Sequence, residues 1–153
     1  MNIAEDRQIK LSISWVKPEL DKSIQIVKNG LEEYGDNLGK FDPLLTVLEQ
    51  LKLMRGTFHI LEFYGASLLI EDMERTVRSL LAKLTNKPED AYEAMVQATM
   101  ALAGYVDKLN QSPDDAPVIL LPIINDLRAS RGEPLLTESS LFLPNLSIIP
   151  RLP

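Results

Sequence analysis

Apolar residues recur three and four positions apart through most of this chain, and proline or glycine interrupts the pattern at intervals. That spacing places side chains along one face of an α-helix. The first such stretch begins at Pro18, and the second runs from Asp42 to about Tyr64–Gly65. A third follows it, and a fourth runs from Pro88 to about Asn110. Because the breaks are short, we expect an all-α fold, an up-and-down antiparallel four-helix bundle.

The apolar stripe of each stretch predicts its buried face. The expected core residues are Leu20, Ile24, Val27, Leu31 and Tyr34; Leu44, Val47, Leu48, Leu51, Met54, Phe58 and Leu61; Leu69, Met73, Val77, Leu80 and Leu84; and Tyr92, Met95, Val96, Thr99, Ala103 and Val106. Met100 also has core spacing. Trp15, which precedes the first stretch, is expected to pack on the bundle.

The C-terminal part of the chain differs from the four stretches. The segment Pro117–Arg128 is mostly apolar and contains Pro122, which indicates a short fifth helix kinked or begun at that proline. Beyond Gly132, four prolines exclude long regular structure. We therefore expect a helical domain at residues 1–131 and an extended, Pro-rich tail or linker at 132–153.

Charge and composition exclude several classes of function. The 153 residues carry a net charge of −6, and their lysines and arginines are scattered, which argues against nucleic-acid binding. No run approaches the roughly 20 apolar residues of a membrane span. The polar N-terminal residues do not resemble a signal peptide, and the absence of cysteine fits a reducing compartment. We expect a cytoplasmic protein without membrane insertion.

The chain offers few groups for catalysis or metal binding. It has one histidine and no cysteine, so it supports neither a Ser-His-Asp nor a Cys-His arrangement. Four carboxylates lie close together in sequence, Glu62, Glu71, Asp72 and Glu74. They lack the Glu-x-x-His pairs of carboxylate metal sites and are expected to face solvent. We predict no metal, no cofactor and no enzymatic activity for this chain.

Gly56 is the unusual residue of the second stretch, because glycine inside a helix costs about 1 kcal/mol relative to alanine. Turning 100° per residue places Lys52, Gly56, His59 and Phe63 on one face, away from the apolar stripe. Arg55 flanks that face. A small residue beside a basic one on an exposed helix gives room for the backbone of a partner protein.

The triplet Arg55-Gly56-Thr57 resembles the motif of histidine phosphotransfer (Hpt) domains, in which a basic-Gly-small sequence follows the phosphorylated histidine by one turn. Here that histidine position holds Lys52, which is protonated at neutral pH and cannot substitute. His59 lies two turns further on. The motif thus keeps its cation, its small residue and its hydroxyl without its nucleophile.

The resemblance extends from about Ser14 to about Leu146. Over these residues the chain is similar to the first domain of the CheA-like hybrid histidine kinases of type IV pilus (Pil-Chp) chemosensory systems. The segments that carry it are Lys52–Ala66, Leu69–Met73, Leu120–Ala129, Arg131–Gly132 and Glu138–Phe142. It implies an N-terminal, degenerate Hpt-like bundle of a parent kinase whose catalytic chemistry lies elsewhere. A related stand-alone scaffold protein of twitching motility carries a similar domain, so both parentages remain open.

The resemblance implies a pseudo-phosphotransfer domain that acts as a docking or scaffold module in the control of type IV pili and twitching motility. Its partners would be a response-regulator receiver domain or a polar scaffold protein, together with the remaining domains of the parent kinase. The expected binding residues are Lys52, Arg55, Gly56, Thr57, His59 and Phe63.

Two other functions remain open. In the first, His59 is a relocated phosphoacceptor and the chain is an active phosphorelay intermediate. In the second, the apolar segments Pro117–Leu127 and Phe142–Leu152 pack against another copy, and the chain is a self-association module.

Overall fold

The computed structural model describes the backbone of residues 3–111 and 117–139, and side chains from residue 13 onward within those ranges, that of Pro117 excepted. The helices are α1 (Ile3–Asp36), α2 (Asp42–Ile60), α3 (Tyr64–Leu81), α4 (Pro88–Gln111), the 3₁₀ helix η1 (Pro117–Leu120) and α5 (Leu121–Ser130). The described residues form no strand, which confirms the all-α fold.

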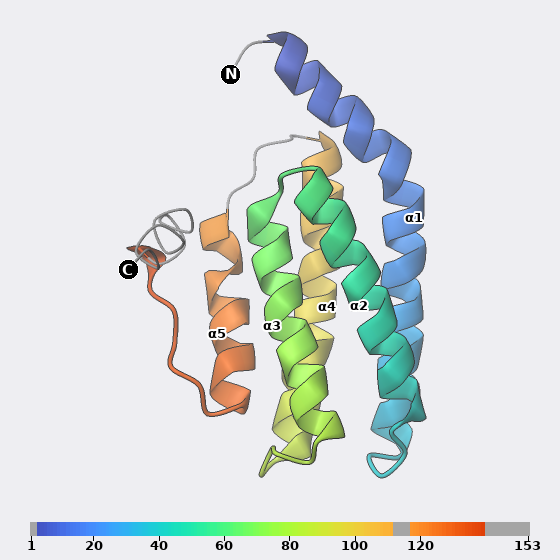
Figure 1. The fold of residues 1–153 in the computed structure, drawn as a ribbon, viewed down its shortest axis with the longest axis vertical. Coiled ribbons are helices and arrows are strands. Elements are labelled where there is room, and N and C mark those ends of the chain that lie inside the picture. Colours follow the sequence, from blue (N-terminus) through green and yellow to red (C-terminus); the bar gives the residue numbers. More distant parts are fainter. Residues whose placement is uncertain (1–2, 112–116, 140–153) are drawn as a thin grey trace, which may run out of the picture.

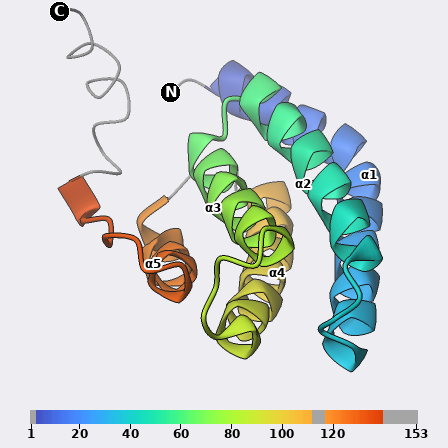
Figure 2. The ribbon, with the colours of Figure 1, turned by 60° about the horizontal axis from the view of Figure 1, so that its bottom comes forward.

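The four long helices close into a ring of neighbours. Helix α2 packs on α1 and α3, and α4 packs on α3 and α1. Short connections make successive helices antiparallel (Figure 1). Helix α5 lies outside this ring and contacts α3 and α4 (Figure 2). Helix α3 is therefore enclosed by α2, α4 and α5, which decides where its polar side chains lie.

Most of the predicted core positions are buried or packed against the core. The exceptions lie at helix ends or on outer faces. Leu84 lies three residues beyond Leu81, the last residue of α3, and is 75% exposed. Met100 is 59% exposed on α4. Trp15 is 82% exposed, so the expectation that it packs on the bundle is wrong.

Helix α1 begins well before Pro18, which corrects the predicted start. Pro18 lies inside the helix, where its missing N–H removes one bond of the helical ladder, at a cost of about 3 kcal/mol. Ile13 is fully buried and Val16 packs against the core. They lie seven and four residues before Leu20, in the same apolar stripe. Their burial offsets the break. The helix changes direction along its length (Figure 1).

Helix α2 ends at Ile60 rather than at Tyr64–Gly65. Glu62 adopts a left-handed backbone conformation with φ 63°. The N–H of Phe63 donates to the carbonyl of Phe58 at 2.9 Å, and the N–H of Glu62 donates to that of His59 at 3.1 Å. These two bonds form a Schellman cap. Gly65, the predicted stop, is instead buried in the first turn of α3.

The same cap ends two other helices. Lys83, with φ 56°, closes α3, and Gly132, with φ 73°, closes α5. In α5 the N–H of Glu133 donates to the carbonyl of Arg128 at 2.9 Å. The fifth helix is confirmed, with Pro122 in its first turn. Residues 112–116 and 140–153, including the apolar segment Phe142–Leu152, lie outside the described residues.

Candidate functional site

The outer face of α2 holds three of the predicted site residues. Lys52, Gly56 and His59 are all exposed. A Cβ added to Gly56 would meet nothing within 4 Å beyond its own helix. Gly56 is therefore open to solvent rather than pressed against a neighbouring helix. The open space at Gly56 leaves room for the backbone of a partner protein, as the sequence around Gly56 predicts.

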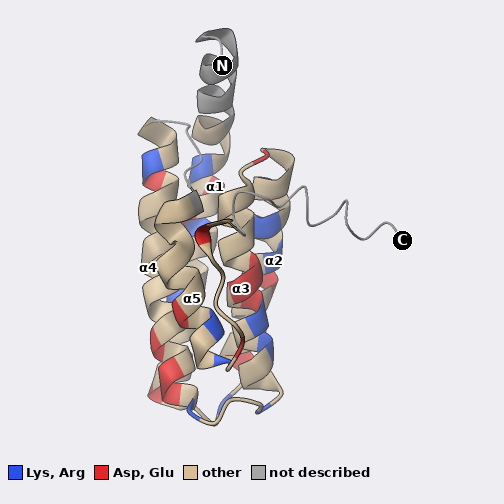
Figure 3. Cartoon of the chain, turned by 90° about the vertical axis from the view of Figure 1, so that its left-hand side faces the viewer, with Lys and Arg blue, Asp and Glu red and all other residues tan. Residues whose placement is uncertain are grey.

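Arg55, at the edge of this face, pairs with a buried carboxylate on α3. Its Nη1 lies 3.2 Å from Oε2 of Glu74, whose side chain is fully buried. Nη2 of Arg78 lies 3.7 Å from Oε1 of the same carboxylate. The expectation that Glu74 faces solvent is therefore wrong. Figure 3 shows the basic positions of α2 beside the acidic positions of α3.

Burial dominates the electrostatics of Glu74. Neither of its oxygens has a hydrogen-bond partner among the described residues. Burial raises the pKa of Glu74 above its ordinary value, and Arg55 and Arg78 oppose that rise. The charge of Arg55 is thus directed at Glu74. In an Hpt domain the equivalent cation would balance a phosphoryl group.

Two predicted site residues have local roles. The hydroxyl of Thr57 donates to the carbonyl of Leu53 at 3.2 Å, within its own helix. His59 places its ring edge-on to that of Tyr64, with ring centres 5.9 Å apart. His59 remains exposed.

Phe63 does not belong to the face. It is 3% exposed and lies between α2 and α3, next to the cap at Glu62. The sequence interpretation extended α2 through Phe63, and the earlier end of the helix turns this side chain into the core. The structure thus brings Lys52, Arg55, Gly56, Thr57 and His59 together and excludes Phe63.

A set of exposed apolar residues, not expected from the sequence, lies on the same side of α2. Leu45, Leu53 and Ile60 are all more than half exposed. A turn of 100° per residue places them within about 80° of one another, with Gly56 between them. That spacing was available in the sequence. It was obscured because α2 also carries a complete buried stripe.

A second ionic cluster joins α3 to α5. Asp72, expected to face solvent, is 1% exposed, and its Oδ1 accepts a hydrogen bond from Nη2 of Arg131 at 2.6 Å. Nη1 of Arg131 donates to the hydroxyl of Thr76 at 2.8 Å and to the carbonyl of Asp72 at 2.9 Å. Arg128 and Glu133 complete the cluster. This arrangement fastens α5 rather than offering a site.

The segment after α5 is also attached. The amide of Asn125 donates to the carbonyl of Leu136 at 3.0 Å, and its oxygen accepts the Leu136 N–H at 2.7 Å. Residues 133–136 therefore follow α5 closely. The boundary proposed at residue 131 stays a prediction.

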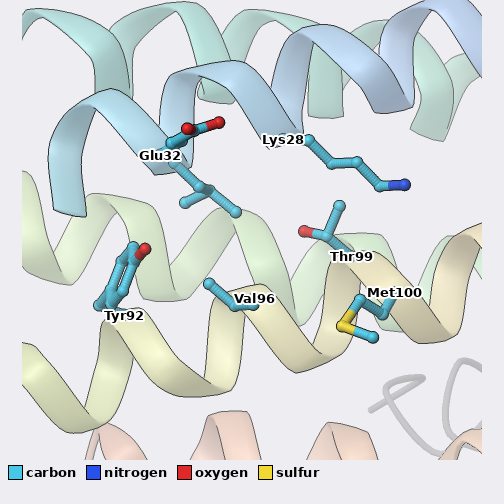
Figure 4. Close-up of a pocket in the computed structure, with 7 residues that line it drawn as sticks. Lys28, Glu32, Tyr92, Val96, Thr99 and Met100 are labelled. Atoms are coloured by element: carbon cyan, nitrogen blue, oxygen red, sulfur yellow. The ribbon is translucent and has the colours of Figure 1, made fainter. Parts of the chain in front are cut away.

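A groove with a mostly apolar lining lies on another face, between α1 and α4. It encloses about 210 Å³, and Lys28 and Glu32 of α1 lie across it from Val96 of α4 (Figure 4). Tyr92, Thr99 and Met100 complete its wall on α4. No predicted site residue lines it. Among the described residues, no group of His, Cys, Asp or Glu is arranged to hold a metal ion.

One curated protein is similar to this chain over most of its length. Scaffold protein FimL of Pseudomonas aeruginosa is 29% identical over 142 residues, which cover 93% of this chain and 25% of that protein. The chain thus spans about a quarter of the length of the curated relative it matches. No protein-family model matches the chain, and no solved structure matches it.

The relative is named a scaffold protein, and kinase parentage of this chain stays a prediction. None of the helices described here is long and apolar enough to cross a membrane.

Proposed function

We propose that this chain is a non-catalytic pseudo-phosphotransfer domain that serves as a docking module of a two-component chemosensory system controlling type IV pili and twitching motility. The outer face of α2 is its binding surface. The observation that carries the proposal is the open Gly56 beside Lys52, on an exposed face where the phosphoacceptor would stand.

The ionic surroundings support a binding role over phosphotransfer. Arg55 is engaged by the buried Glu74, so it is not free to balance a phosphoryl group on α2. Lys52 is an ammonium at neutral pH and cannot act as the nucleophile. The similarity to a protein named a scaffold agrees with docking without catalysis.

The partner we propose is a response-regulator receiver domain or a polar scaffold protein. The test substitutes Gly56 by arginine. Because Gly56 is exposed with open space around it, Gly56→Arg is expected to leave the fold unchanged and to weaken binding of the partner at least about tenfold. Calorimetry with purified receiver domains measures the affinity, and far-UV circular dichroism checks the fold. The control is Gly104→Arg, at an equally open position on α4. Equal affinities for wild type and Gly56→Arg would reject this face.

The competing function is a phosphorelay through His59, which is exposed and is the chain's single histidine. Intact-mass measurement after incubation with a phosphorylated receiver domain distinguishes the two. We expect no added phosphate on wild type. Phosphate that appears on wild type and disappears in His59→Ala would replace the docking proposal with a relay.

A further inference from the structure

The outer face of α2 exposes three large apolar side chains that the core does not use. Leu45 is 55% exposed, Leu53 59% and Ile60 81%. Together with Gly56 they lie within about 80° of the helix circumference. Apolar side chains of this size, gathered on one helix face, are typical of a protein interface. The face also carries the exposed charges of Glu49 and Lys52, and it is open at Gly56.

A midpoint between Lys52 and Leu53, near the middle of α2, defines a register in which this face complements itself. Leu45 lies as far before that point as Ile60 lies after it. Glu49 lies as far before it as Gly56 lies after it, and Leu53 lies beside it. When a helix pairs antiparallel with its own copy about a two-fold axis at such a point, each residue faces its counterpart. Leu45 would then meet Ile60 of the other copy.

The charged residues of the face fit the same pairing. Glu49 and Lys52 are exposed, and neither forms an ion pair within the described part of the chain. In the antiparallel pair Glu49 of one copy lies over Gly56 of the other, where the missing side chain leaves room. Lys52 is one turn from Gly56, so its ammonium reaches the carboxylate of Glu49 from the other copy. The pairing therefore forms two equivalent charge pairs.

We infer that the outer face of α2 binds a second copy of this chain, helix to helix and antiparallel, about a two-fold axis beside Leu53. The inference rests on the proposed function of this face as a docking surface and adds its regulation. Self-pairing covers Lys52 and Gly56, so the dimer and the complex with another partner exclude each other. In this register Leu45 meets Ile60 and Lys52 meets Glu49 of the other copy, and this self-complementarity selects a second copy as the occupant.

The first test is the oligomeric state of the full chain. Light scattering coupled to size-exclusion chromatography, and sedimentation over a concentration series, should show a dimer whose dissociation constant rises at least about tenfold in Leu53→Glu. The matched control is Leu84→Glu, an exposed leucine after α3 and away from this face. A monomer for wild type at high micromolar concentration would overturn the inference, and so would a dimer that Leu53→Glu leaves unchanged.

A charge exchange tests the two-fold register. Glu49→Lys and Lys52→Glu should each weaken the dimer, because each places like charges together across the axis. The double variant Glu49→Lys/Lys52→Glu restores opposite charges on both sides and should recover the wild-type dissociation constant. A double variant weaker than both single variants would reject the antiparallel register.

A disulfide reports the same geometry independently. The chain has no cysteine, so Leu53→Cys introduces a single thiol beside the two-fold axis. Mild oxidation should give a covalent dimer for Leu53→Cys and not for Met100→Cys, which is exposed on α4. Equal cross-linking of both variants would indicate collision rather than pairing and would contradict the inference.

The proposed function and this inference fail separately. If a receiver domain binds but the chain is monomeric, docking stands and self-pairing is wrong. If the chain dimerises through α2 and none of the receiver domains binds, self-pairing stands and the proposed partner is wrong. If both occur, added receiver domain should dissociate the dimer, and the receiver should not bind the Leu53→Cys cross-linked form.

Discussion

Two carboxylates buried on α3, Asp72 and Glu74, have contrasting environments. Asp72 faces α5 and accepts a hydrogen bond from Arg131, itself 2% exposed in its side chain. Glu74 faces α2 and has ion pairs with Arg55 and Arg78, whose side chains are about half exposed, and neither oxygen of Glu74 is hydrogen-bonded within the described residues. Asp72 thus forms an ion pair in which both side chains are buried, whereas Glu74 is a buried carboxylate whose arginine partners are partly exposed to solvent.

The difference shows that burial alone does not define the role of a charged residue. The contact between Asp72 and Arg131 joins two helices, and both charges depend on it because neither reaches water. The arginines that pair with Glu74 remain partly exposed, so water can solvate their charges without the carboxylate. The first contact is structural, and the second orients Arg55 at the edge of the outer face of α2.

The largest effect is expected from Arg131→Ala, which leaves Asp72 buried without its main partner. We expect the free energy of unfolding to fall by about 3–5 kcal/mol. Urea denaturation followed by circular dichroism measures it. The control is Arg75→Ala, an exposed arginine on α3, expected to change the free energy by less than about 0.5 kcal/mol. Similar losses in both variants would contradict a special role for Arg131.

A smaller effect is expected from Thr76→Val, which removes one acceptor of Arg131 and preserves shape. The loss should be about 1 kcal/mol. Thr99→Val is the matched control, because the buried Thr99 hydroxyl donates within its own helix, to the carbonyl of Met95. A double-mutant cycle of Thr76→Val with Arg131→Ala should show coupling. Strict additivity would place Thr76 outside the cluster.

Glu74→Gln is expected to change the free energy of unfolding at neutral pH by less than about 1 kcal/mol, or to raise it. The variant removes the cost of burying a charge and loses two ion pairs with solvated arginines, and these terms offset. Asp72→Asn, the equivalent change at the other carboxylate, should be clearly destabilising because it leaves the buried Arg131 with one counter-charge, the partly exposed Glu133. Equal losses in denaturant melts would remove the distinction between the two sites.

The smallest effect concerns pH. Burial raises the pKa of Glu74 above its ordinary 4.5, so its stabilising contribution is fully present below pH 4.5 and is lost as pH rises through the folded-state pKa. The hydrogen bond from Arg131 lowers the pKa of Glu133 below 4.5, so its contribution is present above pH 4.5 and is lost as pH falls. Between about pH 3 and about pH 7, the urea midpoint of Glu74→Gln should rise relative to that of wild type, because the variant lacks the contribution that wild type loses over this range. The midpoint of Glu133→Gln should fall relative to that of wild type over the same range.

The fold was predictable where burial follows helical periodicity. The stripes of α2 and α4 correctly indicated positions such as Leu51 and Met95. The polar interior of α3 was not recognised, because a four-helix bundle leaves one face of each helix in solvent. Helix α5 covers that face of α3 at Asp72, whereas Glu74 lies against α2. Asp72 and Glu74 do lie in register with buried neighbours, Leu69 and Ile70, so the spacing contained the signal.

Helix ends were harder to predict than helix faces. The cap of α2 uses Glu62 and that of α3 uses Lys83, although glycine is usual at this position. Without glycine, a sequence gives little indication that the helix stops. The end of α2 then decided the candidate site, because it moved Phe63 from the outer face into the core. The exposed face itself was predictable from the spacing of Lys52, Gly56 and His59.

The hydrogen bonds between Asn125 and Leu136 have a consequence for the smallest fragment that folds alone. A chain cut after Arg131 would retain all of α5 but lose Glu133 and the backbone of Leu136. Asn125, partly buried, would then lack both partners, and Arg131 would keep only its contacts to α3. We therefore expect a fragment that ends at Leu136 to be more stable than one that ends at Arg131.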